Sequence, residues 1–184
     1  PRSTLVRSSA ASVGYKRLDY ELQLLFILRQ VVEILEHLGG LGPIAVEPTL
    51  AAPNIYDYRS KMEVSFGTKR WLTAEEIASG DELPTGFALG LHIPKRYDKI
   101  LDLEECHLQG PRSMQIVNSV RRLAQAKGWP AYDANTQEGY LRNLVVRTGF
   151  FTGETMIYLV TRHNLPDRMT LLTEAVSYTH LRAH

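Results

Sequence analysis

The segment "DKILDLEECHLQG" brings together side chains that could bind a metal or act as a nucleophile. Cys106 is the one cysteine among 184 residues, and acidic residues and His107 flank it. A thiolate can ligate a metal or attack an electrophile, and carboxylates beside a histidine can exchange protons. Asp102, Glu104 and Glu105 end a strand-like run, in which adjacent side chains point to opposite faces. The pattern therefore predicts a solvated acidic edge, with Cys106 as a small buried hydrophobic residue.

A second set of side chains, basic and aromatic, has the chemistry of single-stranded RNA recognition. Guanidinium groups offer forked donors to phosphates, and tyrosine rings stack on unpaired bases. The basic residues that we single out as RNA contacts are Arg59, Lys61, Arg96, Arg142 and Arg147, and the nearby tyrosines are Tyr58, Tyr97 and Tyr140. The alternative is that the basic residues are solvated and the tyrosines packed, which is the ordinary situation on strand edges and turns.

The composition of the chain excludes several classes of protein. Lys and Arg total 21 against 20 Asp and Glu, so the net charge of +1 gives no overall attraction to nucleic acid or membrane. RNA binding must then come from local patches. One cysteine cannot form an internal disulfide, so a reducing cytoplasm is expected. No apolar stretch reaches the ~20 residues that span a bilayer. We expect a soluble monomer without DNA or membrane partners.

The elements that must position these residues follow from periodicity and stop signals. Helical spacing predicts a helix over 18–38, followed by two glycines, and another over 110–128, closed by Gly128. A Thr73–Glu76 capping box predicts a short helix. A further helical pattern begins after Asp167, a predicted cap, and breaks after Glu174. Alternating apolar residues predict strands over 61–66 and 86–93, and the apolar run 99–103 predicts a third. Two more strands are predicted over 141–148 and 154–160, joined as a hairpin. In 86–93, the alternating apolar residues are Phe87, Leu89, Leu91 and Ile93. The mixed order favours an α+β fold with a mainly antiparallel sheet and flanking helices.

Four segments in order carry a resemblance to a known family: "LDYELQLLFILRQVVEILEHLGG", "YRSKMEVSFG", "ALGLHIPKRYDKILDLEECHLQ" and "GYLRNLVVRTGFFTGETMIYLV". Together they resemble the RNA uracil-C5 methyltransferases, which make 5-methyluridine in tRNA and large-subunit rRNA. The resemblance covers residues 15–174. It implies the central α+β domain of such an enzyme, between an RNA-binding β-barrel and a Rossmann-like domain that binds S-adenosylmethionine. Among the basic candidates, Arg59 and Arg142 lie inside the matched segments.

The resemblance gives Cys106 a second interpretation. Many members hold a [4Fe–4S] cluster on four cysteines, and Cys106 matches the fourth ligand. The other three would precede the helix that starts near Leu18, where this chain has none. Because such a cluster needs four thiolates, this chain alone cannot hold it. Two explanations stay open: the N-terminal residues are mistranslated after a frameshift, or the protein has lost the cluster.

The resemblance also implies what the chain lacks. In the family, a cysteine thiolate adds to C6 of uracil and a base removes the C5 proton, and both groups belong to the C-terminal domain. We therefore expect no catalytic residue here and a role in RNA positioning, with rRNA favoured over tRNA. Residues 1–14 are expected to be irregular, and 175–184 resemble a translated sequencing adapter, so that 15–174 form the natural domain, truncated at its C-terminal end. Two alternatives remain: a stand-alone RNA-binding module without activity, and an α+β domain whose match is structural alone.

Overall fold

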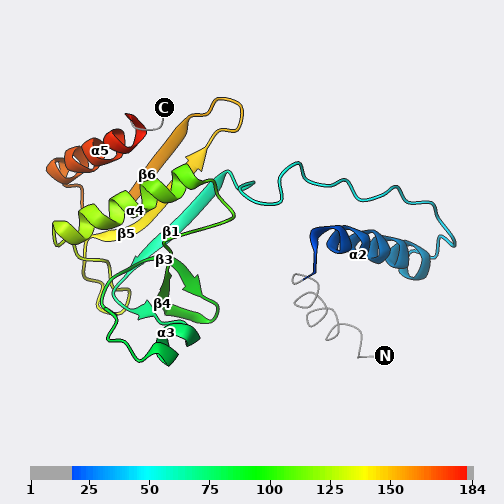
Figure 1. Ribbon diagram of the computed structural model, residues 1–184, viewed down its shortest axis with the longest axis horizontal. Helices are drawn as coiled ribbons and strands as arrows, with labels where there is room; N and C mark the ends of the chain where they lie inside the picture. Colours follow the sequence, from blue (N-terminus) through cyan, green and yellow to red (C-terminus); the bar gives the residue numbers. More distant parts are fainter. Residues whose placement is uncertain (1–17, 182–184) are drawn as a thin grey trace. The chain divides into compact units, whose positions relative to one another are not determined.

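The chain divides into two compact units, Pro1–Ile55 and Tyr56–His184 (Figure 1). The computed structural model describes residues 18–181, with side chains as far as Glu174. The predicted irregular start, 1–14, lies outside the described residues, as do the last three residues of the predicted adapter-like tail.

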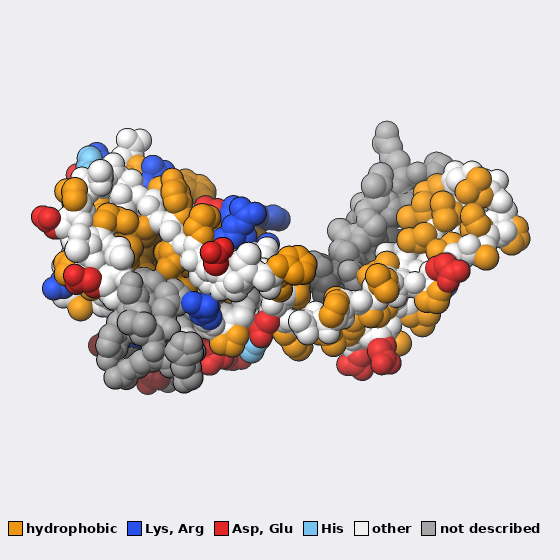
Figure 2. Space-filling model, turned by 90° about the horizontal axis from the view of Figure 1, so that it is seen from above, with side chains coloured by type: hydrophobic (Ala, Val, Ile, Leu, Met, Phe, Trp, Pro, Cys, Tyr) orange, Lys and Arg blue, Asp and Glu red, His pale blue; other side chains and the backbone are white. Residues whose placement is uncertain are grey.

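The first unit is a helix followed by extended chain. α2 (Tyr20–Glu33) continues into a π-helical segment, η1 (Ile34–Leu38), and Gly39 ends the helix as predicted. None of the residues of the two segments is buried, and hydrophobic side chains gather on the surface of this unit (Figure 2). The Thr49 hydroxyl donates a hydrogen bond to the carbonyl of Leu24 at 3.1 Å, which holds the extended chain against the helix.

The second unit is built on a six-stranded sheet with the order β2-β4-β3-β1-β5-β6. The strands are β1 (Lys61–Gly67), β2 (Arg70–Trp71), β3 (Ala88–Ile93), β4 (Arg96–Asp102), β5 (Leu141–Thr148) and β6 (Thr155–Thr161). All neighbours pair antiparallel except β2 and β4, which are parallel. The predicted α+β fold with a mainly antiparallel sheet is therefore confirmed. The two-residue strand β2 was not predicted.

Two long helices accompany this sheet, α4 (Pro111–Ala126) and α5 (Pro166–Leu181), and the short helix α3 (Ala74–Ser79) follows β2. Figure 1 shows α4 lying across the sheet, with α5 beside it. The apolar residues of β1 and of α4 meet in the core: Met62, Val64, Phe66, Met114, Val117, Val120 and Ala124 are all buried. The alternation that predicted β1 and the stripe that predicted α4 thus identify the two surfaces that pack together.

The capping box forms as the sequence predicts. The Thr73 hydroxyl accepts a hydrogen bond from Glu76 N–H at 3.2 Å, and the Glu76 carboxylate accepts one from Thr73 N–H at 2.8 Å. These bonds satisfy donors that the first turn of a helix leaves without partners. They also lower the pKa of Glu76, with the backbone donor of Thr73 as the main cause.

Two details of the predicted elements are wrong. In β3, Leu89 is buried but Leu91 is 37% exposed, because β3 pairs with β1 no further than Gly90 and then extends beyond the core. Helix α5 starts at Pro166, so Asp167 lies in its first turn instead of capping it, and the helix continues past Glu174 to Leu181. Nothing in 175–181 breaks a helix, since the segment contains neither glycine nor proline.

No helix among the described residues has the length and apolarity to cross a membrane.

A largely buried ion network joins α4 to the edge of the sheet. Arg121 of α4 is 7% exposed, and its guanidinium lies 3.1 Å from the Asp102 carboxylate at the end of β4. The same guanidinium donates to the carbonyl of Leu89 at 2.8 Å, and Leu89 N–H donates to Asp102, also at 2.8 Å. Arg70 of β2 approaches the other oxygen of Asp102 at 3.9 Å and pairs with Glu76 of α3. Asp102 is therefore an ion-paired anchor, with a side chain only 14% exposed, which corrects the prediction that it belongs to a solvated edge.

Candidate functional site

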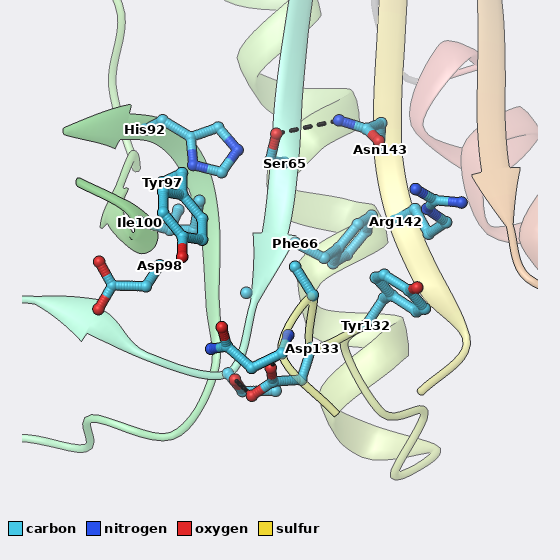
Figure 3. A pocket seen from close by; sticks show the side chains of 14 residues that line it. Ser65, Phe66, His92, Tyr97, Asp98, Ile100, Tyr132, Asp133, Arg142 and Asn143 are labelled. Carbon is cyan, nitrogen blue, oxygen red and sulfur yellow. Dashed lines mark hydrogen bonds between the residues drawn. The ribbon is translucent and has the colours of Figure 1, made fainter. Parts of the chain in front are cut away.

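A cleft of about 150 Å³ opens where β1, β3, β4 and β5 meet the loop that precedes β5. Figure 3 shows side chains from all these segments converging on it. Its lining is mostly polar and aromatic and includes Ser65, Thr68, His92, Tyr97, Asp98, Tyr132, Asp133, Asn135, Arg142 and Asn143. The cleft joins residues that are up to 78 positions apart in sequence, such as Ser65 and Asn143.

Two paired polar side chains lie between β1 and β5 in the cleft. Ser65 and Asn143 stand opposite each other in the β1–β5 register, and the Asn143 amide donates to the Ser65 hydroxyl at 3.0 Å (Figure 3). Val64 and Leu144, their neighbours, point into the core and are buried. The remaining donor and acceptor capacity of the amide and hydroxyl is available to a ligand.

One side of the cleft is a cation stacked on an aromatic ring. The guanidinium carbon of Arg142 lies 4.5 Å from the centroid of the Tyr132 ring (Figure 3). Arg142 sits at a β-bulge, because Leu141 and Asn143 have successive partners in β6 and Arg142 has none between them. A bulge redirects side chains, so Arg142 and Asn143, although adjacent in sequence, both line the cleft.

The loop that carries Tyr132 is fixed by its next residue. Asp133 accepts hydrogen bonds from the Thr68 hydroxyl and from Asn135 N–H, both at 2.8 Å. These donors lower the pKa of Asp133, and the Thr68 hydroxyl is the main cause. Asp133 therefore joins the turn after β1 to the loop before β5, and Tyr132 N–H donates to the carbonyl of Leu141 at 2.7 Å, so the backbone that carries the Tyr132 ring is held against β5.

The opposite side of the cleft comes from the β3–β4 hairpin, with His92, Tyr97 and Asp98 (Figure 3). Tyr97 is 73% exposed, so its ring is accessible to a ligand. Arg96 donates two hydrogen bonds to Asp98, at 3.0 and 3.1 Å, and thereby lowers the pKa of that carboxyl. The Arg96 charge is largely balanced by this pairing, which makes it the weakest of the five basic candidates.

The structure brings three of the predicted basic residues to the same face of the sheet. Lys61 and Arg147 stand opposite each other in the β1–β5 register, and both are exposed. They lie four residues from the Ser65–Asn143 pair, roughly 13 Å at about 3.3 Å per residue. Glu63, between the two pairs, is 4.0 Å from Lys61. Arg142 lies in the cleft itself. Lys61 and Arg147 thus lie near one end of this polar face, and Arg142 lies in the cleft at the other.

Arg59 and the predicted tyrosines have varied positions. Arg59 is exposed just before β1, where its N–H donates to the carbonyl of Leu108 at 2.8 Å. Tyr58 is exposed. Tyr140 is buried in the core, with its ring edge against Trp129 at a centroid distance of 6.0 Å, so the prediction that it could stack on a base is wrong.

The sequence did not reveal Tyr132 as the partner of Arg142, nor the roles of Ser65, Asn143 and Asp133. A usable signal existed for Asp133, because "DANTQEG" has the composition of a side-chain-stabilised turn. Nothing in the sequence indicates which loop reaches over β5.

Cys106 is a free, partly buried thiol packed against the hydrophobic core. Its neighbour His107 contacts Tyr56 edge to face, at a centroid distance of 6.0 Å. The residues present do not fit an iron–sulfur cluster, because the chain has one cysteine and the described residues include no group of three or more potential ligands. That Cys106 corresponds to a ligand position stays a prediction.

Proteins named RNA methyltransferases match most of this chain. An uncharacterised RNA methyltransferase of Chlorobaculum tepidum is 38% identical over 158 residues, which are 85% of this chain and 32% of that protein. Another, of Bacteroides thetaiotaomicron, is 34% identical over 161 residues, 88% of this chain and 35% of that protein. The resemblance to RNA methyltransferases is thereby confirmed. The chain spans about a third of the length of these curated relatives.

A solved structure shares the fold. The tRNA (uracil-54, C5)-methyltransferase of Pyrococcus abyssi, in complex with S-adenosyl-L-homocysteine, superimposes with a TM-score of 0.60 at 24% identity. The match covers 85% of this chain and 33% of that one. No protein-family model matches the chain.

Proposed function

We propose that this chain is the central segment of a longer, S-adenosylmethionine-dependent RNA uracil-C5 methyltransferase, and that its cleft positions single-stranded RNA in the cytoplasm. The observation that carries the proposal is the Arg142–Tyr132 pair beside the Ser65–Asn143 hydrogen bond, in a chain homologous to RNA methyltransferases. A cation, a ring and a polar pair are the groups that bind an unpaired nucleotide.

The arrangement of the cleft supports binding rather than bond making. Arg142 supplies a forked donor for phosphate or a base carbonyl, and Tyr132 keeps that fork in place by stacking. Ser65 and Asn143 offer hydrogen bonds to a base edge. A thiolate nucleophile and a base for removal of the C5 proton would then come from another part of the longer protein, as would the S-adenosylmethionine site.

Lys61 and Arg147 extend this surface. A strand of RNA whose base occupies the cleft could place a neighbouring phosphate at this pair, since both side chains are exposed on the same face. The attraction between these cations and phosphates would weaken as salt concentration rises. Of the two RNA classes, rRNA is proposed first on one condition: that the protein once had the three further cluster cysteines, since the resemblance implies that cluster-bearing members lean towards rRNA. tRNA is the alternative.

The binding role is tested with the 184-residue chain itself. Fluorescence anisotropy with a labelled oligouridine should show binding that weakens with salt. Arg142→Ala should weaken binding by about 5- to 30-fold, which corresponds to about 1–2 kcal/mol. Lys127→Ala, at the end of α4, is the matched control because it removes the same charge from an exposed position outside the cleft. Equal affinity of the two variants would contradict the proposed role of the cleft.

The enzymatic part is tested with the longer protein that contains this segment. Incubated with S-adenosylmethionine and unmodified rRNA or tRNA, it should produce 5-methyluridine, detected by mass spectrometry of the nucleosides. Arg142→Ala should lower kcat/KM for the RNA. RNA binding without any 5-methyluridine would instead support a binding module, and the RNA that acquires the modification identifies the substrate class.

A further inference from the structure

A second hollow, a groove of about 470 Å³, lies next to the cleft at the edge of the sheet. It is lined by β2 and the residues next to it, by Ile77 of α3, by Thr85 and Gly86 before β3, and by Lys99 of β4. Thr68 lines both the cleft and the groove, so the two hollows adjoin. None of the residues that line this groove is one of the five basic residues singled out from the sequence as RNA contacts.

The groove is positively charged. Lys69, Arg70 and Lys99 line it, and no carboxylate does. Arg70 is neutralised by its ion pairs with Glu76 and Asp102. Lys69 and Lys99, in contrast, form no ion pair within the described part of the chain. The lowered pKa values of Asp133 and Asp98 have the Thr68 hydroxyl and the Arg96 guanidinium, respectively, as their main causes, and Lys69 makes a small contribution to both. Two lysines are therefore available to an anion.

The groove also holds an aromatic ring. The ammonium nitrogen of Lys99 lies 5.2 Å from the centroid of the Trp71 ring. Trp71 is half-buried, and the exposed side chain of Ile77 completes the apolar part of the groove. Cations beside an indole ring are the combination with which proteins bind the phosphates and bases of single-stranded nucleic acid.

The position of Trp71 is well defined. β2 pairs in parallel with β4, and Trp71 stands opposite Leu101 in that register. Ile100 N–H donates to the carbonyl of Lys69 at 3.0 Å, which fixes the backbone that carries Lys69 next to the strand that carries Lys99. Trp71 and Lys99 thus lie on paired strands, and Lys69 lies in the turn directly before β2, where its carbonyl is bonded to β4.

We propose that this groove is a second nucleotide site for single-stranded RNA, in which Lys69 and Lys99 bind phosphate and Trp71 contacts the attached base. The proposal rests on the proposed function, because it extends the RNA path from the cleft across Thr68. The strand would place one base beside Arg142 and Tyr132 and a neighbouring nucleotide at Trp71. The cleft would select the nucleotide by hydrogen bonds, and the groove would hold the strand without regard to sequence.

Tryptophan fluorescence gives a direct test, because the chain contains two tryptophans and the other, Trp129, is buried in the core. In Trp129→Phe, the emission reports Trp71 alone. Addition of an eight-nucleotide oligouridine should quench it, and the quenching should decrease with salt. If Trp129→Phe does not fold, Trp71→Phe in the otherwise unchanged chain gives the complementary result: the quenching seen in the wild type should disappear.

Charge variants test the phosphate contacts in the same binding assay. Lys69→Met and Lys99→Met keep the aliphatic stems and remove one charge each. Each should weaken oligouridine binding about 3- to 10-fold and reduce the slope of log affinity against log salt by about 0.7, the value for one phosphate contact on a single strand. Lys127→Ala should leave the slope unchanged.

The outcomes separate this inference from the function on which it rests. If the chain binds RNA and Arg142→Ala weakens binding, but Trp71 emission does not respond and both lysine variants behave like Lys127→Ala, the groove is not an RNA site and the proposed role of the cleft stands. If the chain does not bind RNA at all, both are wrong. Quenching of Trp71 together with reduced salt slopes supports the second site.

Discussion

Replacement of Arg121 by methionine should destabilise the protein strongly, although Arg121 touches neither the cleft nor the groove. Its guanidinium is the partner of the Asp102 carboxylate at 3.1 Å and of the Leu89 carbonyl at 2.8 Å, and it also donates to the Leu103 carbonyl. Leu89 is fully buried, so water cannot replace the lost donor. Removal of one partner of a buried ion pair costs about 3–5 kcal/mol, because the other charge is left buried without compensation.

The free energy of unfolding is measured by urea denaturation followed by circular dichroism. Arg122→Ala is the matched control, because Arg122 is the next residue of α4 and is exposed, and it should change stability by less than about 0.5 kcal/mol. Asp102→Asn should also destabilise, and the double variant should lose less than the sum of the two single losses by at least about 1 kcal/mol. A loss below about 1 kcal/mol for Arg121→Met, or strictly additive effects, would refute the view that this network anchors α4 to β4.

Three further predictions concern the core, the helix cap and acid. Leu144→Ala removes a fully buried side chain from β5 and should cost about 2–5 kcal/mol in urea denaturation, whereas a loss under about 1 kcal/mol would mean that the core closes around the cavity. Thr73→Ala removes the cap of α3 and should cost about 1 kcal/mol, with Thr73→Ser restoring most of it. The pKa of Asp133 is lowered on folding, chiefly by Thr68, so this carboxylate stabilises the protein above its unfolded pKa of about 3.9 and the contribution is lost as pH falls through the lower folded value. In Asp133→Asn, the free energy of unfolding, measured by urea denaturation at a series of pH values, should therefore fall less steeply below about pH 4 than in the wild type. Its pH dependence above neutral pH should be unchanged.

Local patterns predicted the elements because those elements have local causes. Met62, Val64 and Phe66 alternate in sequence because every second side chain of a strand points to the same face. In β1 that face packs in the core with the residues of α4. Thr73 and Glu76 predicted the start of α3 because both halves of a capping box lie within one turn.

Features that depend on distant partners were not predictable in the same way. Arg121 and Asp102 are charged residues of the kind found on surfaces, and their burial follows from the way α4 meets β4. Tyr140 and Tyr132 have the same side chain, but one packs on Trp129 in the core and the other reaches Arg142 in the cleft. The Arg142–Tyr132 pair depends on a bulge, which no periodicity of β5 indicates.

The bulge at Arg142 makes the cleft depend on the number of residues in β5 as well as on their types. A regular strand would send Arg142 and Asn143 to opposite faces, and the extra residue is what lets both line the cleft. A deletion of one codon near Leu141 could therefore abolish ligand contacts while every chemically important side chain is still encoded. When homologous sequences are compared to infer activity, the number of residues in this segment should therefore count as much as the identity of the residues.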